Sequence, residues 1–182
     1  MSRNCTLVVC GAPLAVRAVD VARALAEAGW QVRVILTDAS AGWVPTAPLE
    51  QLGLDPQSAP RSLEQPKAEG RADVIAVVPA TFNTVAKLAT GIADSLAHSV
   101  LCEALGDGTP IVAVPMVNTR LWGHPAWAGH TRLLGDAGVV FLDPHTGEPG
   151  LVPVASGTGE AVTEKFDPAW LIHQVDLVVA RV

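Results

Sequence analysis

The sequence is poor in charged residues and contains no cluster of basic ones. Only 16% of its 182 residues are charged, and 12 Lys and Arg against 18 Asp and Glu give a formal net charge of −6. Proteins that bind nucleic acid through its phosphates need clustered positive charge. We therefore expect no nucleic-acid partner.

Long hydrophobic runs are also missing. The longest apolar stretches have the length of a strand, far below the roughly 20 residues that span a bilayer. The chain begins Met-Ser-Arg-Asn-Cys and enters a predicted strand at once, without the charged, apolar and small-residue regions of a signal peptide. We therefore expect no membrane partner and a cytoplasmic location.

The sequence lacks the patterns of a metal site. The three cysteines, Cys5, Cys10 and Cys102, do not have the short spacing of metal ligands. The five histidines include no HxxxH pair, so a zinc site has no support. We expect no metal and interpret the cysteines as structural thiols, with Cys5 and Cys10 facing opposite sides of one strand.

Hydrophobic residues, in contrast, make up 49% of the chain. A chain of this length can bury a core without disulfides or metals, and residues 1–182 are predicted to form one domain. So much apolar surface with so little charge also favours burial at a subunit interface. We therefore expect a homo-oligomer.

Strand and helix patterns alternate along the sequence. Short β-branched apolar runs indicate strands at 6–9, 31–37, 73–79, 110–115 and 138–142. Helical spacing of apolar residues predicts helices at 14–30, 46–54, 83–90, 94–105, 124–137 and 167–182. The third strand is apolar throughout, as expected when helices cover both faces of a parallel sheet. The predicted fold class is α/β, a single doubly wound, Rossmann-like parallel sheet with helices on both faces.

The alternation stops between Asp143 and Lys165, a stretch rich in glycine and proline. Long segments without regular structure are often functional lids, so 143–165 is predicted to be a flexible substrate lid. Within it, SGTGEAV resembles the start of a dinucleotide fingerprint, but Val162 stands at the third glycine and too little chain follows for the rest of that unit. We interpret this motif as a flexible turn.

Polar side chains follow the predicted strands at their carboxyl ends, where the four loops read CGAPLA, LTDASAGW, PATFNT and PMVNTRLW. Ligands of open parallel sheets bind beyond these ends. Short hydroxyl and amide side chains beside helix N-termini can cap the helix or leave its amides for a phosphate. Thr81, Asn83 and Asp94 could each be a simple cap, but the four loops together predict a ligand site.

Three segments carry a resemblance to a known family: VVCGAPLAVRAVDVARAL, PATFNTVAKLATGIADSL and PMVNTRLWGHPA. The chain resembles the homo-oligomeric flavin-containing cysteine decarboxylases, which include phosphopantothenoylcysteine decarboxylase and the lantibiotic peptidyl-cysteine decarboxylases. The resemblance covers residues 8 to about 143. PATFNT stands where the family has Pro-Ala-Ser-Ala-Asn-Thr before a Lys-x-x-x-Gly-x-x-Asp run, and PMVN stands where it has Pro-Ala-Met-Asn.

The resemblance implies that FMN binds at the ends of these strands. The implied cofactor-binding residues are Gly11, Ala12, Pro13, Thr37, Ser40, Trp43, Ala80, Thr81, Phe82, Asn83, Thr84 and Met116. The absence of a complete dinucleotide fingerprint favours FMN over FAD. The resemblance also implies a trimer or a multiple of trimers, with the flavin near the subunit boundary.

The sequence departs from the family around the expected flavin. Residues 11–13 read Gly-Ala-Pro where the family has a glycine-serine turn, which removes one hydroxyl donor. Phosphate binding must then depend on backbone amides, Thr37 and Ser40. Phe82 replaces a small residue, and Trp43 stands where the family often has Phe. Both aromatic residues could pack on the flavin or belong to the core.

Two further departures concern the chemistry. The family's active-site histidine aligns with Gln65, and glutamine cannot transfer a proton. The cysteine with which the phosphopantothenoylcysteine enzymes protonate their intermediate aligns with Ser156. A reductive final step is therefore not expected here.

The resemblance thus implies an enzyme, a flavin-dependent cysteine decarboxylase. The predicted reaction is oxidative decarboxylation of a peptide with a C-terminal cysteine to an aminoenethiol, as in the biosynthesis of aminovinyl-cysteine peptides. Asn118 is the implied catalytic residue, and Val117, Arg120 and Ser156 are also implied at the substrate. Two alternatives stay open: phosphopantothenoylcysteine decarboxylase, and a flavin-binding protein without decarboxylase activity, which the missing histidine favours.

Overall fold

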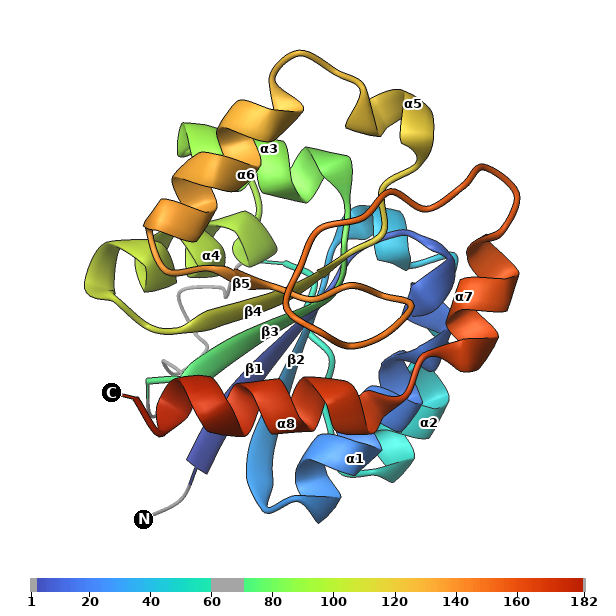
Figure 1. The fold of residues 1–182 in the computed structure, drawn as a ribbon. Helices are drawn as coiled ribbons and strands as arrows, with labels where there is room; N and C mark the ends of the chain where they lie inside the picture. Colours follow the sequence, from blue (N-terminus) through green and yellow to red (C-terminus); the bar gives the residue numbers. More distant parts are fainter. Residues whose placement is uncertain (1–2, 60–70, 182) are drawn as a thin grey trace.

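A parallel five-stranded sheet forms the centre of the molecule (Figure 1). The computed structural model describes residues 3–59 and 71–181. The strands are β1 (Arg3–Val9), β2 (Trp30–Leu36), β3 (Val74–Ala80), β4 (Ile111–Pro115) and β5 (Val140–Phe141). Their order across the sheet is β2-β1-β3-β4-β5, and each neighbouring pair is parallel. The predicted doubly wound α/β fold is confirmed.

Helices cover both faces of the sheet, as Figure 1 shows. One face carries η1 (Pro13–Arg17), α1 (Ala18–Glu27), α7 (Gly159–Lys165) and α8 (Pro168–Val179). The other face carries α3 (Phe82–Thr90), α4 (Leu96–Asp107) and α6 (Trp127–Asp136). Three shorter elements complete the fold. After β2 come η2 (Asp38–Ser40) and α2 (Thr46–Gln51), and after β4 comes α5 (Thr119–Trp122).

The sheet separates two hydrophobic cores. In β1, Leu7 and Val9 pack on the α1 side, whereas Val8 packs on the α3 side, because successive strand side chains point to opposite faces. Cys5 and Cys10 accordingly lie on opposite faces, as predicted. All seven residues of β3 are buried, which agrees with its unbroken apolar sequence.

Some helix boundaries differ from the predictions. The first predicted helix is divided into the 3-10 turn η1 and the α-helix α1. The helix predicted to begin at His124 begins instead at Trp127, and the separate helix α5 precedes it. Pro125 lies between α5 and α6, and a proline disfavours helical backbone at the residue before it.

The prediction that the segment 143–165 lacks regular structure holds for 143–158, which contain only isolated bridges, and was wrong for 159–165. Val154 forms a parallel bridge with Asn118. The last seven residues of the segment form α7, which is held to the core by the buried side chain of Val162. The flexible turn expected in SGTGEAV is limited to its start, where Gly157 has a φ of +85°.

Within residues 3–59 and 71–181, no helix has the length and hydrophobicity needed to cross a membrane. The same residues contain no group of three or more His, Cys, Asp or Glu side chains placed to share a metal ion. Gln65, which aligns with the family's active-site histidine, lies outside the described residues.

Candidate functional site

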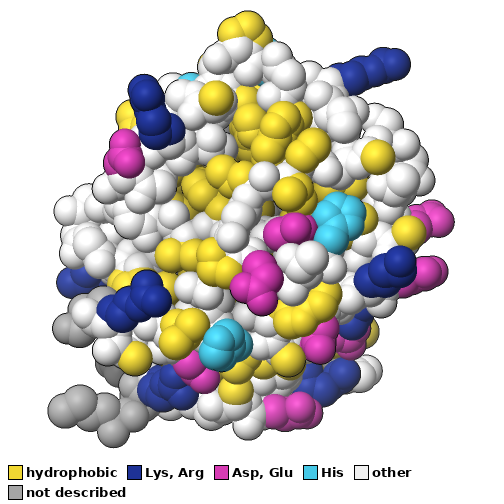
Figure 2. Space-filling view, viewed as in Figure 1, with side chains coloured by type: hydrophobic (Ala, Val, Ile, Leu, Met, Phe, Trp, Pro, Cys, Tyr) yellow, Lys and Arg dark blue, Asp and Glu magenta, His cyan; other side chains and the backbone are white. Residues whose placement is uncertain are grey.

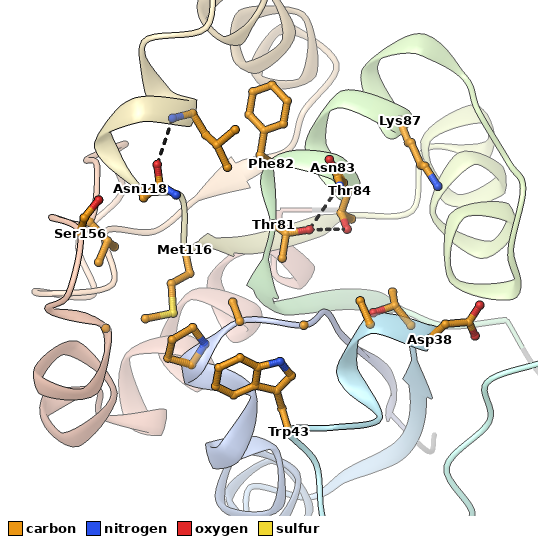
Figure 3. A pocket seen from close by; sticks show the side chains of 18 of the residues that line it. Asp38, Trp43, Thr81, Phe82, Asn83, Thr84, Lys87, Met116, Asn118 and Ser156 are labelled. Carbon is orange, nitrogen blue, oxygen red and sulfur yellow. Dashed lines mark hydrogen bonds between the residues drawn. The ribbon is translucent and has the colours of Figure 1, made fainter.

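A cavity of about 680 Å³ opens at the carboxyl ends of β1 to β4, the edge predicted from the polar loops (Figure 3). Ten predicted cofactor positions line it: Gly11, Ala12, Pro13, Thr37, Trp43, Thr81, Phe82, Asn83, Thr84 and Met116. Two predicted substrate residues, Asn118 and Ser156, line it as well. The fold therefore brings residues from four loops and from the 143–165 segment around one space.

Four predicted site residues do not line the cavity. Ala80 and Val117 are buried next to it at the ends of β3 and β4. Ser40 is fully buried, and its hydroxyl donates a 2.7 Å hydrogen bond to the Thr37 carbonyl. It therefore shapes the loop after β2 instead of facing a ligand. Arg120 is exposed on α5.

The loop after β1 is closely packed. A Cβ atom at Gly11 would come within 2.2 Å of the Ala39 carbonyl oxygen, so only glycine fits between the loops after β1 and β2. Pro13 begins η1, the helical position where its missing amide does not matter. A Cβ atom at Gly159 would come within 2.8 Å of the Pro13 ring. The start of α7 therefore rests directly on the β1 loop.

A chain of small polar groups runs from the end of β1 to the cavity. Thr81 caps α3, because its hydroxyl accepts a hydrogen bond from the Thr84 amide at 3.4 Å. The Thr81 and Thr84 hydroxyl oxygens are 3.1 Å apart, and the Thr84 oxygen is 3.1 Å from the sulfur of Cys10. Asn83, in contrast, lies in the first turn of α3 and lines the cavity without capping the helix.

Large apolar side chains form another part of the cavity wall. Trp43 is 41% exposed, which excludes the interpretation that it is a core residue. Met116 is 8% exposed, and its sulfur accepts a hydrogen bond from the Leu14 amide at 3.2 Å. Phe82 is half-buried, and its ring stacks on Trp127 with centroids 5.6 Å apart. Phe82 therefore belongs both to the cavity wall and to the core.

One polar cluster at the cavity was not predicted. Lys87, Asp94, Ser95 and His98 all line the cavity, and Lys87 forms a 2.7 Å ion pair with Asp94. Ser95, and not Asp94, caps α4. His98 places its Nδ1 atom 2.7 Å from the Ser95 hydroxyl, and its burial, with the nearby Lys87 charge, lowers its pKa. The Lys-x-x-x-Gly-x-x-Asp spacing was a sequence signal for the ion pair, but no signal pointed to His98.

Seven further lining residues were also missed. They are Asp38, Ala39, Leu121, Val154, Ala155, Gly157 and Gly159. Four of these seven belong to the segment 143–165, which comes to the cavity through tertiary packing. Their sequence, rich in glycine and alanine, offers no chemical signal of such a role.

Asn118 caps α5 with its side-chain oxygen, which accepts hydrogen bonds of 3.0 Å from the amides of Arg120 and Leu121. The side-chain nitrogen carries two hydrogens and remains available as a donor. Figure 3 shows Asn118 and Ser156 on the same side of the cavity, away from Lys87 and Asp38. This side therefore offers a neutral amide donor and a hydroxyl group.

The chemistry of the cavity fits a flavin. Its volume falls in the range of about 300–1,000 Å³ that is usual for cofactor sites, and apolar side chains alternate with hydroxyl groups along its wall. The N-terminus of α3 provides backbone amides for a phosphate. Among the described lining residues, Lys87 has the only permanent positive charge, and Asp94 pairs with it. A phosphate must therefore be bound mainly by amides and hydroxyl groups.

Residues 1–165 match the family described as Flavoprotein. The chain belongs to this family. The match confirms the predicted resemblance and identifies the chain as a flavoprotein. The polar loops at the carboxyl edge of the sheet are thus those of a flavin-binding fold.

Two curated relatives and one crystal structure illustrate the family. The bifunctional coenzyme A biosynthesis protein CoaBC of Mycobacterium tuberculosis is 33% identical over 156 residues, 83% of this chain but 36% of the relative. The flavoprotein thus spans little more than a third of the CoaBC relatives it matches. A probable phosphopantothenoylcysteine decarboxylase of Streptococcus mutans is 28% identical, covering 86% of this chain and 91% of the relative. The FMN-dependent cysteine decarboxylase SpaF superposes with a TM-score of 0.67 and 26% identity, covering 90% of this chain and 94% of SpaF.

Proposed function

We propose that this flavoprotein binds FMN and catalyses the oxidative decarboxylation of a peptide with a C-terminal cysteine, releasing an aminoenethiol. Its family membership and its likeness to SpaF support FMN as the cofactor and a cysteine as the decarboxylated group. The observation that carries the proposal is that Asn118 and Ser156 lie on the same side of the cavity. These two residues account for carboxylate binding and for an oxidised product.

Asn118 binds the carboxylate of the substrate through its side-chain nitrogen. Its oxygen is already held by two backbone amides, so the amide group has a fixed orientation. A neutral donor orients the carboxylate without the permanent positive charge that would stabilise it against leaving as carbon dioxide. Capping of α5 thus fixes the position of the Asn118 side-chain nitrogen, and the amide group makes that nitrogen a neutral hydrogen-bond donor.

The loops after β1, β2 and β3 hold the cofactor. Trp43 supplies an apolar surface for a planar ring, Thr81 and Asn83 supply polar groups, and the N-terminus of α3 supplies amides for the phosphate. When bound, FMN supplies a two-electron acceptor for the substrate, the oxidation that this decarboxylation requires.

Ser156 explains why the product stays oxidised. The substrate loses carbon dioxide and two hydrogens, and reducing the product again would require a proton donor beside it. A serine hydroxyl is a very weak acid, and no cysteine is among the described residues that line the cavity. The enethiol therefore leaves, and molecular oxygen can reoxidise the cofactor.

The deciding experiment is incubation of the FMN-loaded protein in air with short peptides that end in cysteine. We expect a peptide with a free C-terminal cysteine to lose the mass of carbon dioxide plus two hydrogen atoms. The same peptide with a C-terminal amide has no carboxylate to lose and should keep its mass. Unchanged mass of both peptides, with FMN bound throughout, would contradict the proposal.

A second candidate is phosphopantothenoylcysteine decarboxylase. The relative from Streptococcus mutans favours it, because that protein is a probable phosphopantothenoylcysteine decarboxylase and 91% of its length is covered. The same assay with phosphopantothenoylcysteine distinguishes the two, since that reaction removes carbon dioxide without a net loss of hydrogen. Loss of mass from neither substrate would favour the third alternative, a flavin-binding protein without decarboxylase activity.

The proposal includes assembly into a trimer or a multiple of trimers. Leu121 and Leu133 are 43% and 49% exposed on α5 and α6, and Figure 2 shows hydrophobic side chains gathered between these helices. Exposed apolar groups of this kind are usual at subunit interfaces. Light scattering tests the assembly, and a monomer that keeps its flavin would contradict it. The three free cysteines are typical of reducing compartments and support a cytoplasmic location.

A further inference from the structure

We propose that Cys10, which does not line the cavity, fixes the Thr81 hydroxyl as a hydrogen-bond donor toward the bound flavin. Cys10 acts through Thr84 and is therefore a positioning residue. The inference uses flavin binding only and needs no assumption about the substrate. Its failure and the failure of the proposed reaction are thus separate results.

The direction of the chain begins at the sulfur. Cys10 is 1% exposed, and its burial raises the pKa of the thiol to about 11, so the sulfur carries its hydrogen at neutral pH. The Thr81 backbone amide donates to this sulfur. Among the described residues, the one side chain that forms a hydrogen bond with this sulfur is Thr84, whose hydroxyl oxygen is 3.1 Å away. The buried S–H group satisfies its hydrogen by donating to the Thr84 oxygen.

The second link runs from Thr84 to Thr81. Thr84 is 4% exposed, and its oxygen receives the S–H hydrogen of Cys10. Its own hydrogen therefore points to the Thr81 oxygen, 3.1 Å away. The Thr81 oxygen then accepts twice, once from this hydroxyl and once from the Thr84 backbone amide at 3.4 Å.

The last hydrogen in the chain is that of the Thr81 hydroxyl. The Thr81 oxygen accepts both of these hydrogen bonds. The Thr81 hydroxyl hydrogen is therefore not used by Thr84 and points away from it. Thr81 is half-buried and lines the cavity, and Figure 3 shows its hydroxyl at the middle of the site. The Thr81 hydroxyl therefore stabilises a flavin atom that accepts a hydrogen bond. It would oppose a flavin N–H group at the same position, because both groups would be donors.

The test measures the dissociation constant of FMN by fluorescence quenching in flavin-free protein reloaded with FMN. Cys10→Ser keeps the donor to Thr84, and we expect its affinity to stay within about twofold of the original. Cys10→Ala removes the donor and lets the Thr81 hydroxyl turn inward, so we expect affinity to fall by about three- to tenfold. Cys5→Ala, which changes a buried cysteine on the opposite face of the sheet, is the matched control and should leave FMN affinity unchanged.

A double-mutant cycle separates positioning from packing. In a Thr81→Val background, Cys10→Ala should have no further effect on FMN affinity, because the hydroxyl whose direction it sets is gone. The inference would be overturned if Cys10→Ser and Cys10→Ala lowered FMN affinity equally. It would also be overturned if Cys10→Ala lowered FMN affinity as much in the Thr81→Val background as in the original protein. If the alanine variant does not fold, the Cys10→Thr and Cys10→Val pair gives the same comparison between side chains of nearly equal shape.

Discussion

The backbone amide of Val154 donates a 2.9 Å hydrogen bond to the carbonyl of Val117, which fixes the segment 143–165 directly beside Asn118. The same segment rests on the β1 loop through the contact between Gly159 and Pro13. These two attachments place Ser156 at the cavity, on the same side as Asn118. The segment is therefore expected to act as a lid that is docked on both sides of Ser156.

Gly159→Ala tests the docked lid. The added Cβ would come within 2.8 Å of the Pro13 ring, and relieving such a contact costs about 1–3 kcal/mol. We expect the lid to move from its seat, with a higher KM for the peptide and faster loss of flavin. Gly150→Ala is the control, because its Cβ meets nothing within 4 Å. Equal kinetics of both variants would show that this contact does not matter for binding.

Asn118→Asp separates the two roles of Asn118. The aspartate keeps an oxygen for the amides of Arg120 and Leu121, so the cap of α5 and the stability should be preserved. It replaces the donor nitrogen with a charged oxygen that repels a carboxylate, so decarboxylation should be lost. Asn118→Ala should lose activity and also about 0.5–2 kcal/mol of unfolding free energy. Activity in the aspartate variant, measured by the peptide mass assay, would remove Asn118 from carboxylate binding.

Asn83→Asp tests the placement of the cofactor. A negative charge in the first turn of α3 favours the helix by about 0.3–1 kcal/mol, so thermal stability should be equal or higher. The same charge repels the phosphate and the reduced flavin, and FMN affinity should fall by about fivefold or more. Asn83→Ala, which removes the amide without adding charge, should have a smaller effect. Unchanged FMN affinity in the aspartate variant would place Asn83 outside the flavin contacts.

His98 should make stability depend on pH. Burial, followed by the Lys87 charge, lowers its pKa from the ordinary value of 6.5. Below about pH 6.5 the unfolded chain therefore binds a proton that the folded chain does not, so the free energy of unfolding falls as the pH drops. The pKa of Asp94 is also lowered from its ordinary value of 3.8, mainly by the hydrogen bond from Lys87. This carboxylate therefore changes the free energy of unfolding only at more acidic pH.

The measurement is urea unfolding at pH 7.5 and pH 5.5. The decrease in unfolding free energy between these values should be smaller in His98→Gln than in the original protein. His145→Gln, at an exposed position, is the control and should keep the full decrease. The same decrease in both variants would assign the pH dependence to other groups.

Much of the site could be predicted because its signals are local. The apolar runs that form β1 to β4 specify buried parallel strands, and the carboxyl ends of such strands meet at one edge of the sheet. Thr81, Asn83 and Asn118 could therefore be assigned to one site from their positions just after strands. The short helix α7 could not, because Gly157 before it and Gly159 at its start also favour turns, and the buried Val162 provides the contact that selects the helix.

The sequence by itself determined the α/β class, the alternation of strands and helices and the edge of the sheet where the cavity lies, since each follows from patterns within single segments. The tertiary structure alone decided which polar groups meet there. Cys10 and Thr84 are 74 positions apart, and their 3.1 Å contact depends on the parallel pairing of β1 with β3. Ser156 lies on the same side of the cavity as Asn118 because the Val154 amide bonds to the Val117 carbonyl, and no local pattern encodes that pairing. Contacts of this kind come from packing between segments, whose energies depend on the whole fold and not on neighbours in the sequence.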